Sequence, residues 1–197
     1  DGRTFDSAVS KETATMVARR FEQIGLPVEA IRPMKPWMVM LMLMAFEVQK
    51  LGLDANRGLD KYFYDKAVAA KKPVIGLETA EFQIDRFDRM PEAVQEQMLR
   101  STLTELAAQG DELKSMIAAW QRGDTATIEK SVRSSFADYP AAYTSLIAER
   151  NRNWIPQLRM CVSSPTPCFV VVGAAHMVGP DGLLALLRQQ GYTVEQQ

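Results

Sequence analysis

The sequence predicts an α-rich α/β protein, in which a small sheet of a few short strands packs with many helices. Two observations predict this fold class. Most of the 197 residues lie in segments whose apolar residues recur at helical spacing. Two short apolar runs, residues 72–79 and 168–174, are instead bounded by proline, glycine and polar residues, as buried strands are. With 47% apolar and 24% charged residues, the chain fits one globular domain over residues 1–197.

The predicted helices share apolar residues three and four positions apart. They cover residues 10–24, 36–52, 58–72, 91–120, 124–136, 143–160 and 180–190. Ser10 is expected to cap the first helix and Gly25 to end it. Pro36 suits the first turn of the second helix, and Gly110 marks a break in the long segment 91–120.

The predicted strands are few. The run "KPVIGLET" reads as a buried strand that ends between Gly76 and Glu78. "CFVVVGA" gives the strongest strand signal, because β-branched and aromatic residues follow one another without a break. Residues 192–197 could form a final short strand. So few strands predict a remnant of a sheet, not one that is stable by itself.

The charges exclude some partners. There are 23 Lys and Arg residues against 24 Asp and Glu, a net charge of -1. This balance gives no electrostatic reason to bind nucleic acid or an anionic membrane surface, and no nucleic-acid-binding motif is present. We therefore expect no nucleic-acid partner.

The segment "PWMVMLMLMAF", residues 36–46, is rich in methionine. It is too short to span the roughly 30 Å of a bilayer core as a helix, so no transmembrane segment is expected. Its length favours a core helix packed by flexible thioethers. The other interpretation is a groove or surface that binds an apolar partner.

Cys161 and Cys168 flank a turn-forming Ser-Ser-Pro-Thr-Pro spacer, so the two sulfurs could meet. A disulfide would indicate an oxidising compartment, which favours a periplasmic or otherwise exported protein. Two free thiols in the cytoplasm are the alternative.

The sequence begins without methionine or a signal-like apolar region, so we expect a processed product or a fragment.

His176, the only histidine, follows the apolar run 168–174 and precedes a glycine-flanked turn. A neutral imidazole at the end of a strand can bind a metal ion or move a proton, although it can also simply cap the strand. Glu78 follows the other apolar run and could be a metal ligand or an acid/base partner, or an ordinary surface carboxylate. We predict that the two side chains lie close together at one sheet edge.

Arg150 and Asn151 lie late in the predicted helix 143–160. The guanidinium offers fixed donors for a carboxylate or an oxyanion, and Asn151 adds a neutral amide. Both could equally belong to a solvated helix face.

Several motifs, taken in order, resemble the TraB/GumN family, which includes the Tiki-type metalloproteases. They are Lys35-Pro36-Trp37, Gly58-Leu59-Asp60, residues 72–79, Gln83, Arg150-Asn151 with Trp154, and residues 169–192. The most specific part is the Gly-x-x-His motif that ends at His176, followed by a glycine-rich helix start.

This resemblance implies a divalent-metal-dependent, peptidase-like hydrolase that acts on a peptide or small molecule. The metal, zinc, manganese or cobalt, would be bound by His176 and Glu78, with Arg150 and Asn151 supporting the transition state. Many bacterial relatives are exported. The family pattern has two Gly-x-x-His motifs, so this chain is expected to be the larger C-terminal part without the first motif and its strands, and inactive alone. The alternative is a non-catalytic binding or scaffold protein that uses the same cleft or the methionine-rich helix.

Overall fold

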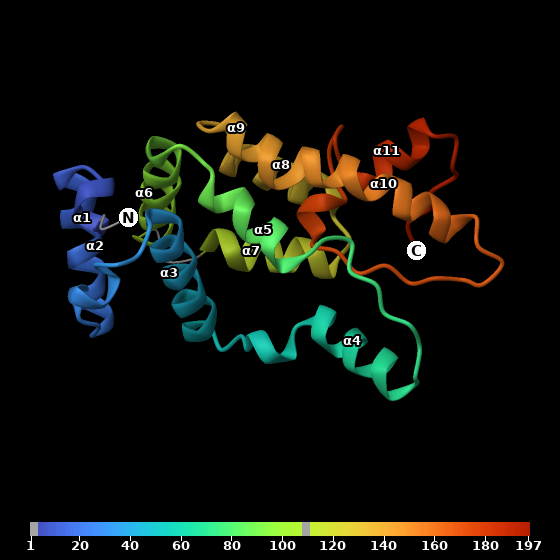
Figure 1. Cartoon of the computed structure of the whole chain (residues 1–197), viewed down its shortest axis with the longest axis horizontal. Helices are drawn as coiled ribbons and strands as arrows, with labels where there is room; N and C mark the ends of the chain where they lie inside the picture. The colour runs from blue at the N-terminus through green and yellow to red at the C-terminus, as the bar shows by residue number, and fades with distance from the viewer. Residues whose placement is uncertain (1–3, 108–110) are drawn as a thin grey trace. The chain divides into compact units, whose positions relative to one another are not determined.

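The computed structural model describes residues 4–107 and 111–197, and Figure 1 shows these residues as helices joined by loops. The α-helices are α1 (Phe5–Ala8), α2 (Lys11–Ile24), α3 (Pro36–Lys50), α4 (Leu59–Ala69), α5 (Ala80–Asp88), α6 (Glu92–Ala107), α7 (Asp111–Gln121), α8 (Thr125–Ser135), α9 (Pro140–Tyr143), α10 (Glu149–Val162) and α11 (Leu183–Gln189). Short 3₁₀ helices are η1 (Val28–Ile31), η2 (Ala55–Arg57) and η4 (Ala174–His176), and η3 (Thr144–Ala148) is a π-helix.

The chain divides into two compact units. Unit 1 contains Asp1–Asp54 and Ile84–Lys114, and unit 2 contains Ala55–Gln83 and Ser115–Gln197. The candidate site residues all belong to unit 2.

In unit 1, α6 packs against both α2 and α3. The Ser10 hydroxyl accepts a hydrogen bond from the backbone N–H of Thr13, and Gly25 ends α2 with a φ of 71°. Pro36 begins α3. These three local predictions are confirmed, because each rests on backbone chemistry that the neighbouring residues already determine. The predicted break at Gly110 lies outside the described residues.

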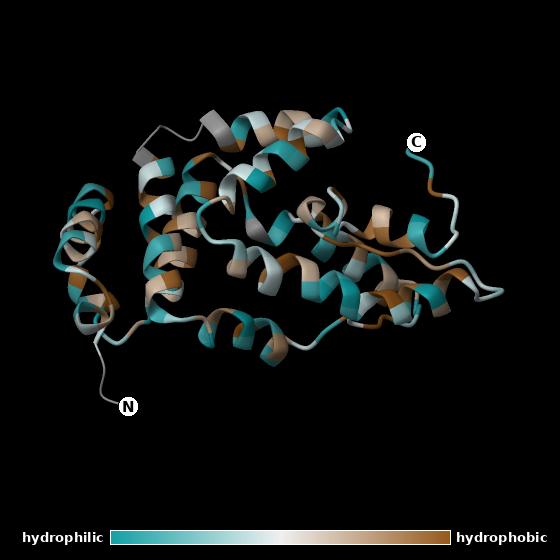
Figure 2. Ribbon diagram, turned by 90° about the horizontal axis from the view of Figure 1, so that it is seen from above, coloured by the Kyte–Doolittle hydropathy of each residue, from teal (hydrophilic) through white to brown (hydrophobic). Residues whose placement is uncertain are grey.

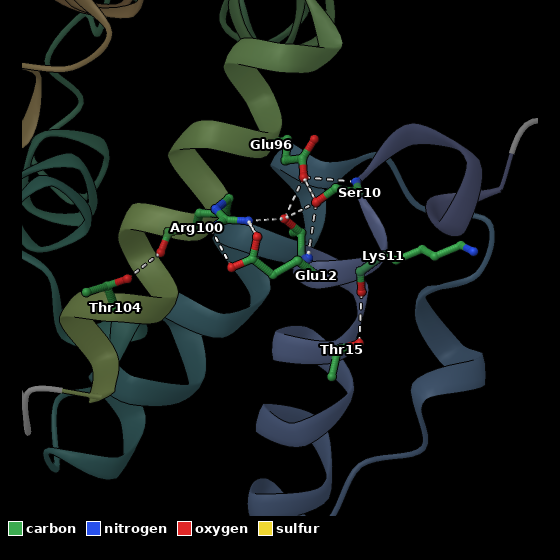
Figure 3. Close-up of polar contacts among 8 residues, drawn as sticks. Ser10, Lys11, Glu12, Thr15, Glu96, Arg100 and Thr104 are labelled. Atoms are coloured by element: carbon green, nitrogen blue, oxygen red, sulfur yellow. Dashed lines mark hydrogen bonds and ion pairs between the residues drawn. The ribbon is translucent and has the colours of Figure 1, made fainter.

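A polar cluster joins α2 to α6 within unit 1 (Figure 3). The Oε1 atom of Glu96 accepts from the Ser10 backbone N–H at 2.9 Å and from the hydroxyls of Ser10 and Thr13, both at 2.5 Å. Arg100, one helical turn later, donates to Glu12 at 3.0 Å. The N-terminus of α2 is therefore hydrogen-bonded to α6.

The methionine-rich helix α3 is only half buried. Val39, Met40 and Leu43 are in the core of unit 1. Met38 and Met44, on the other side, are 40% and 46% exposed. The segment is a helix with a core face, as its length predicts, but it also presents a second, exposed apolar face.

In unit 2, α10 packs against α11 and η3, and η4 packs against α8. Trp154, Leu158 and Leu183 form a buried cluster, against which Leu77 and Val172 also pack. This cluster brings the ends of two distant segments, near residues 77 and 172, to the same side of α10.

The predicted small sheet is wrong, and with it the α/β fold class. No strand occurs among the described residues, and no backbone hydrogen bond joins residues 72–79 to 168–174. Both segments, and residues 192–197, are extended or bent chain. Figure 2 shows the apolar, extended stretch between α10 and η4. Ile75 and Phe169 are 80% and 72% exposed. An apolar run predicts burial, but a strand also requires a partner for its N–H and C=O groups, and none is supplied here.

Within the ranges that the structure describes, no helix is long and apolar enough to cross a membrane.

Candidate functional site

Trp154 of α10 lies at the centre of the candidate site and is 4% exposed. Its indole ring lies 4.6 Å from the imidazole of His176, measured between ring centroids. Its Nε1–H donates to Oε2 of Glu78 at 3.3 Å. The guanidinium of Arg150 stands 5.0 Å from the same ring. Trp154 therefore contacts each of the three charged or titratable groups of the site.

Helical spacing and an unusual turn place the α10 residues. Trp154 follows Asn151 by three positions and Arg150 by four, so it is a neighbour of both on the surface of α10. The π-helix η3 immediately precedes them, and Arg150 Nη1 donates to the carbonyl of Leu146 in that turn at 2.9 Å. π-turns widen a helix and are frequent at functional sites.

Glu78 is held by donors on both oxygens. Arg150 donates from Nε to Oε2 at 3.0 Å and from Nη2 to Oε1 at 2.5 Å. Gln83 Nε2 adds a bond to Oε1 at 3.1 Å, and Trp154 completes the set at Oε2. The Arg150 and Glu78 side chains are only 11% and 13% exposed. The carboxylate therefore fixes the guanidinium in place, and its lone pairs are largely occupied.

Asn151 is fully buried and joins α10 to the loop that carries His176. Its Oδ1 lies 2.7 Å from Nδ1 of His176. Its Nδ2 donates to the backbone carbonyls of His176 at 3.2 Å and of Asp181 at 2.7 Å. The Asp181 carboxylate also pairs with Arg152 on the surface. One amide side chain thus holds both ends of the turn 176–181.

His176 is 7% exposed. Burial, and then the positive charge of Arg150, lower the pKa of the imidazole to about 4, against the opposing effect of Glu78. The ring is therefore neutral at neutral pH. Its Nε2 has no hydrogen-bond partner within residues 4–107 and 111–197.

All four residues singled out from the sequence, His176, Glu78, Arg150 and Asn151, lie in this one cluster. The reason differs from the predicted sheet edge, because α10 and Trp154 gather them instead. The backbone carbonyl of Asp181, a partner of Asn151, was not predicted from the sequence. Trp154 was named only as a position that resembles the TraB/GumN family. The helical spacing of Trp154 from Arg150 and Asn151 could have indicated a shared face.

The side chains present do not make a complete metal site. In the described part of the chain, no three His, Cys, Asp or Glu side chains gather closely enough to hold a metal ion. Protein zinc sites use at least three protein ligands. With Glu78 occupied by Arg150, His176 offers a single nitrogen ligand.

Cys161 and Cys168 form a disulfide with a Cα separation of 5.9 Å, as their turn-forming spacer predicts. The bond links the end of α10 to the extended segment that leads to His176. It therefore connects the two parts of the chain that supply Asn151 and His176.

Comparison with known proteins identifies the family of this chain. The TraB/PrgY/gumN family matches residues 1–196. The YbaP protein of Escherichia coli (strain K12) is 28% identical over 183 residues, which cover 93% of this chain and 67% of the relative. The YbaP protein of Shigella flexneri matches with the same identity and coverage. No solved structure matches the chain significantly. The chain belongs to the TraB/PrgY/gumN family.

Proposed function

We propose that this chain supplies the reactive histidine of a peptidase-like hydrolase. One observation carries the proposal: His176 is a neutral imidazole whose Nδ1 is held by Asn151 while Nε2 has no partner among the described residues. Nε2 is not among the fully buried side-chain atoms that lack a partner in the described residues, so a water molecule or a substrate can reach it. The resemblance to metalloproteases stated above supports the same class of reaction.

In this proposal, Nε2 of His176 is the general base. It accepts a proton from water as the water oxygen attacks the carbonyl carbon of an amide. The carbon–nitrogen bond then breaks, and the imidazolium returns the proton to the leaving amine. The low pKa of His176 favours the neutral form that this step needs.

Arg150 has a supporting role. Glu78 and the Leu146 carbonyl hold its guanidinium in one orientation. The N–H groups that remain can donate to a substrate carboxylate or to the oxyanion of the tetrahedral intermediate. Glu78 and Trp154 act on Arg150 and not on the substrate.

A divalent cation, when bound, would polarise the carbonyl and acidify a water molecule. The described side chains offer one free ligand for it, so a metal-dependent form of this hydrolase needs further ligands. Zinc, manganese and cobalt are therefore each added to the assay in turn.

The test uses the natural polypeptide that carries these residues, with quenched fluorescent peptides as substrate and with each cation present or absent. His176→Ala and His176→Gln should each lower hydrolysis on the order of 100-fold or more, because a positioned base contributes about that much. Arg159→Ala, a change of an exposed residue in the same helix, is the matched control. Hydrolysis that survives in both His176 variants at the control rate would refute the proposal.

A second function is favoured by the exposed side of α3. Met38, Leu41, Met44 and Phe46 are each more than a third exposed. Flexible methionines on an open face suit the binding of an apolar partner segment. If this binding is the main function, Met38→Lys with Met44→Lys should abolish capture of the partner, while His176→Ala should leave capture unchanged.

A further inference from the structure

We propose that Asn151 is a positioning residue that selects which nitrogen of His176 reacts, by holding the ring in the tautomer with a proton on Nδ1 and a lone pair on Nε2. The tautomer follows from the geometry alone. Its chemical consequence rests on the proposed function, because only a hydrolase with a histidine base would use the lone pair.

The orientation of the Asn151 amide is determined by two carbonyl groups. One end of the amide faces the backbone oxygens of His176 and Asp181, at 3.2 Å and 2.7 Å. A carbonyl oxygen can only accept hydrogen bonds, so the end that faces both oxygens must be the NH₂ group. The reversed amide would bring its own oxygen against two other oxygens in a fully buried position.

The orientation of the amide then determines the tautomer. With NH₂ committed to the carbonyls, Oδ1 is the atom that lies 2.7 Å from Nδ1 of His176. An amide oxygen donates no proton, so Nδ1 must carry the hydrogen. The other tautomer would place two lone pairs against each other with no solvent to separate them, since Asn151 is 0% exposed.

Two more contacts restrict the position and the rotation of the His176 ring. One of the carbonyls that Asn151 binds belongs to His176 itself, so the same side chain fixes the backbone from which the ring projects. The indole of Trp154 lies against the ring at a centroid distance of 4.6 Å and restricts its rotation. Nε2 is left as the nitrogen that can accept a proton.

The test is a measurement on one residue, because the chain contains a single histidine. Long-range ¹H–¹⁵N correlation spectra of protein labelled with ¹⁵N-histidine distinguish a protonated from an unprotonated ring nitrogen. At neutral pH the natural sequence should show protonated Nδ1 and unprotonated Nε2. Asn151→Ala should lose this preference and show protonated Nε2.

Two further variants complete the design. Asn151→Asp puts a carboxylate oxygen opposite Nδ1, so it should keep the Nδ1–H tautomer although it loses both bonds to the carbonyls. Asn153→Ala makes the same truncation on an exposed residue of the same helix, and should give the spectrum of the natural sequence. In the peptidase assay, Asn151→Ala should lower kcat on the order of 100-fold with little change in KM, and Asn151→Asp should recover part of the loss.

The outcomes separate this inference from the proposed function. Protonated Nε2 in the natural sequence, or an unchanged spectrum in a folded Asn151→Ala protein, would overturn the role of Asn151. If Asn151→Ala does not fold, the natural sequence and Asn151→Asp still decide the tautomer. If the tautomer is as stated but His176→Ala retains hydrolysis, the function fails and the positioning of the ring stands.

Discussion

Arg150 and Glu78, which are 72 positions apart in the sequence, form a bidentate ion pair. The pair is almost buried, so loss of one partner leaves the other charge without its counter-ion and with little access to water. We expect Glu78→Gln to lower the free energy of unfolding by about 3 kcal/mol, the lower end of the cost of breaking a buried pair. Urea denaturation measures this value.

The exposed carboxylate of Glu195 provides the matched control in unit 2. Glu195→Gln should change the free energy of unfolding by less than about 0.5 kcal/mol. Equal effects of the two substitutions would show that Glu78 does not anchor Arg150.

The free energy of unfolding should decrease as the pH is lowered, because of His176. The pKa of this histidine is about 4 in the folded protein, below its ordinary value of 6.5. Between these values the unfolded chain binds a proton that the folded chain does not. The contribution is fully present above pH 6.5 and is lost as the pH falls toward the folded pKa. From pH 7 to pH 5 the loss should be about 2 kcal/mol.

His176→Gln removes the titrating group and keeps a side chain of similar size and polarity. The difference in unfolding free energy between pH 7 and pH 5 should therefore shrink by about 2 kcal/mol in this variant. A pH profile that is the same with glutamine at this position would mean that the imidazole titrates normally in the folded protein.

Most of the helices could be predicted from the sequence because their determinants are local, although α5 (Ala80–Asp88) was not predicted. Ser10, Gly25 and Pro36 act on backbone groups within four residues, and the predicted helix boundaries follow them closely. The predicted sheet is wrong, because a strand depends on a partner distant in sequence, which an apolar run does not reveal. The runs that contain Ile75 and Phe169 have strand-like composition, yet they lie extended and exposed.

The candidate site was predictable as a set of residues and not as an arrangement. Glu78 and His176 do lie in one cluster, as their positions after two apolar runs suggested, but Trp154 joins them in place of a sheet edge. The pairing of Glu78 with Arg150 is a contact over 72 positions. Nothing in the sequence could say that the same carboxylate predicted as a metal ligand would be occupied by a guanidinium.

The Cys161–Cys168 disulfide should stabilise the folded chain by about 2–3 kcal/mol, because it closes a short loop and so restricts the unfolded state. Cys161→Ser with Cys168→Ser removes it. Denaturation of the natural sequence with and without dithiothreitol gives the same comparison without mutation. The double variant itself should be insensitive to dithiothreitol, and any remaining sensitivity would implicate some other effect of the reductant.

The link between α2 and α6 in unit 1 depends on the charge of Glu96. Burial of this carboxylate raises its pKa, but the hydrogen bonds from Ser10 and Thr13 outweigh burial, and the net pKa is below the usual value of 4.5. This stabilisation is present above the unfolded pKa and is lost as the pH falls through the folded pKa. Glu96→Gln should cost about 1.5 kcal/mol at neutral pH, as loss of a charge-assisted hydrogen bond does. Glu22→Gln, at an exposed position of α2, should cost nothing measurable.

Divalent metal should bind this 197-residue chain weakly. His176 supplies one nitrogen, and Glu78 can act as a second ligand only if it gives up its bonds to Arg150 and Trp154. One imidazole leaves a cation mostly hydrated, without the fixed geometry that tight sites impose. Calorimetric titration with zinc, manganese and cobalt should therefore show no stoichiometric binding.

Arg150→Met distinguishes the two reasons for weak binding. Removal of the guanidinium frees the Glu78 carboxylate and also removes a positive charge that lowers the pKa of His176. If occupation of Glu78 is what prevents a two-ligand site, the variant should bind zinc measurably more tightly than the natural sequence. His176→Ala in the same background should abolish the gain, because the nitrogen ligand is then lost. Tight one-to-one binding by the natural sequence would show that the ligand set extends beyond these two side chains.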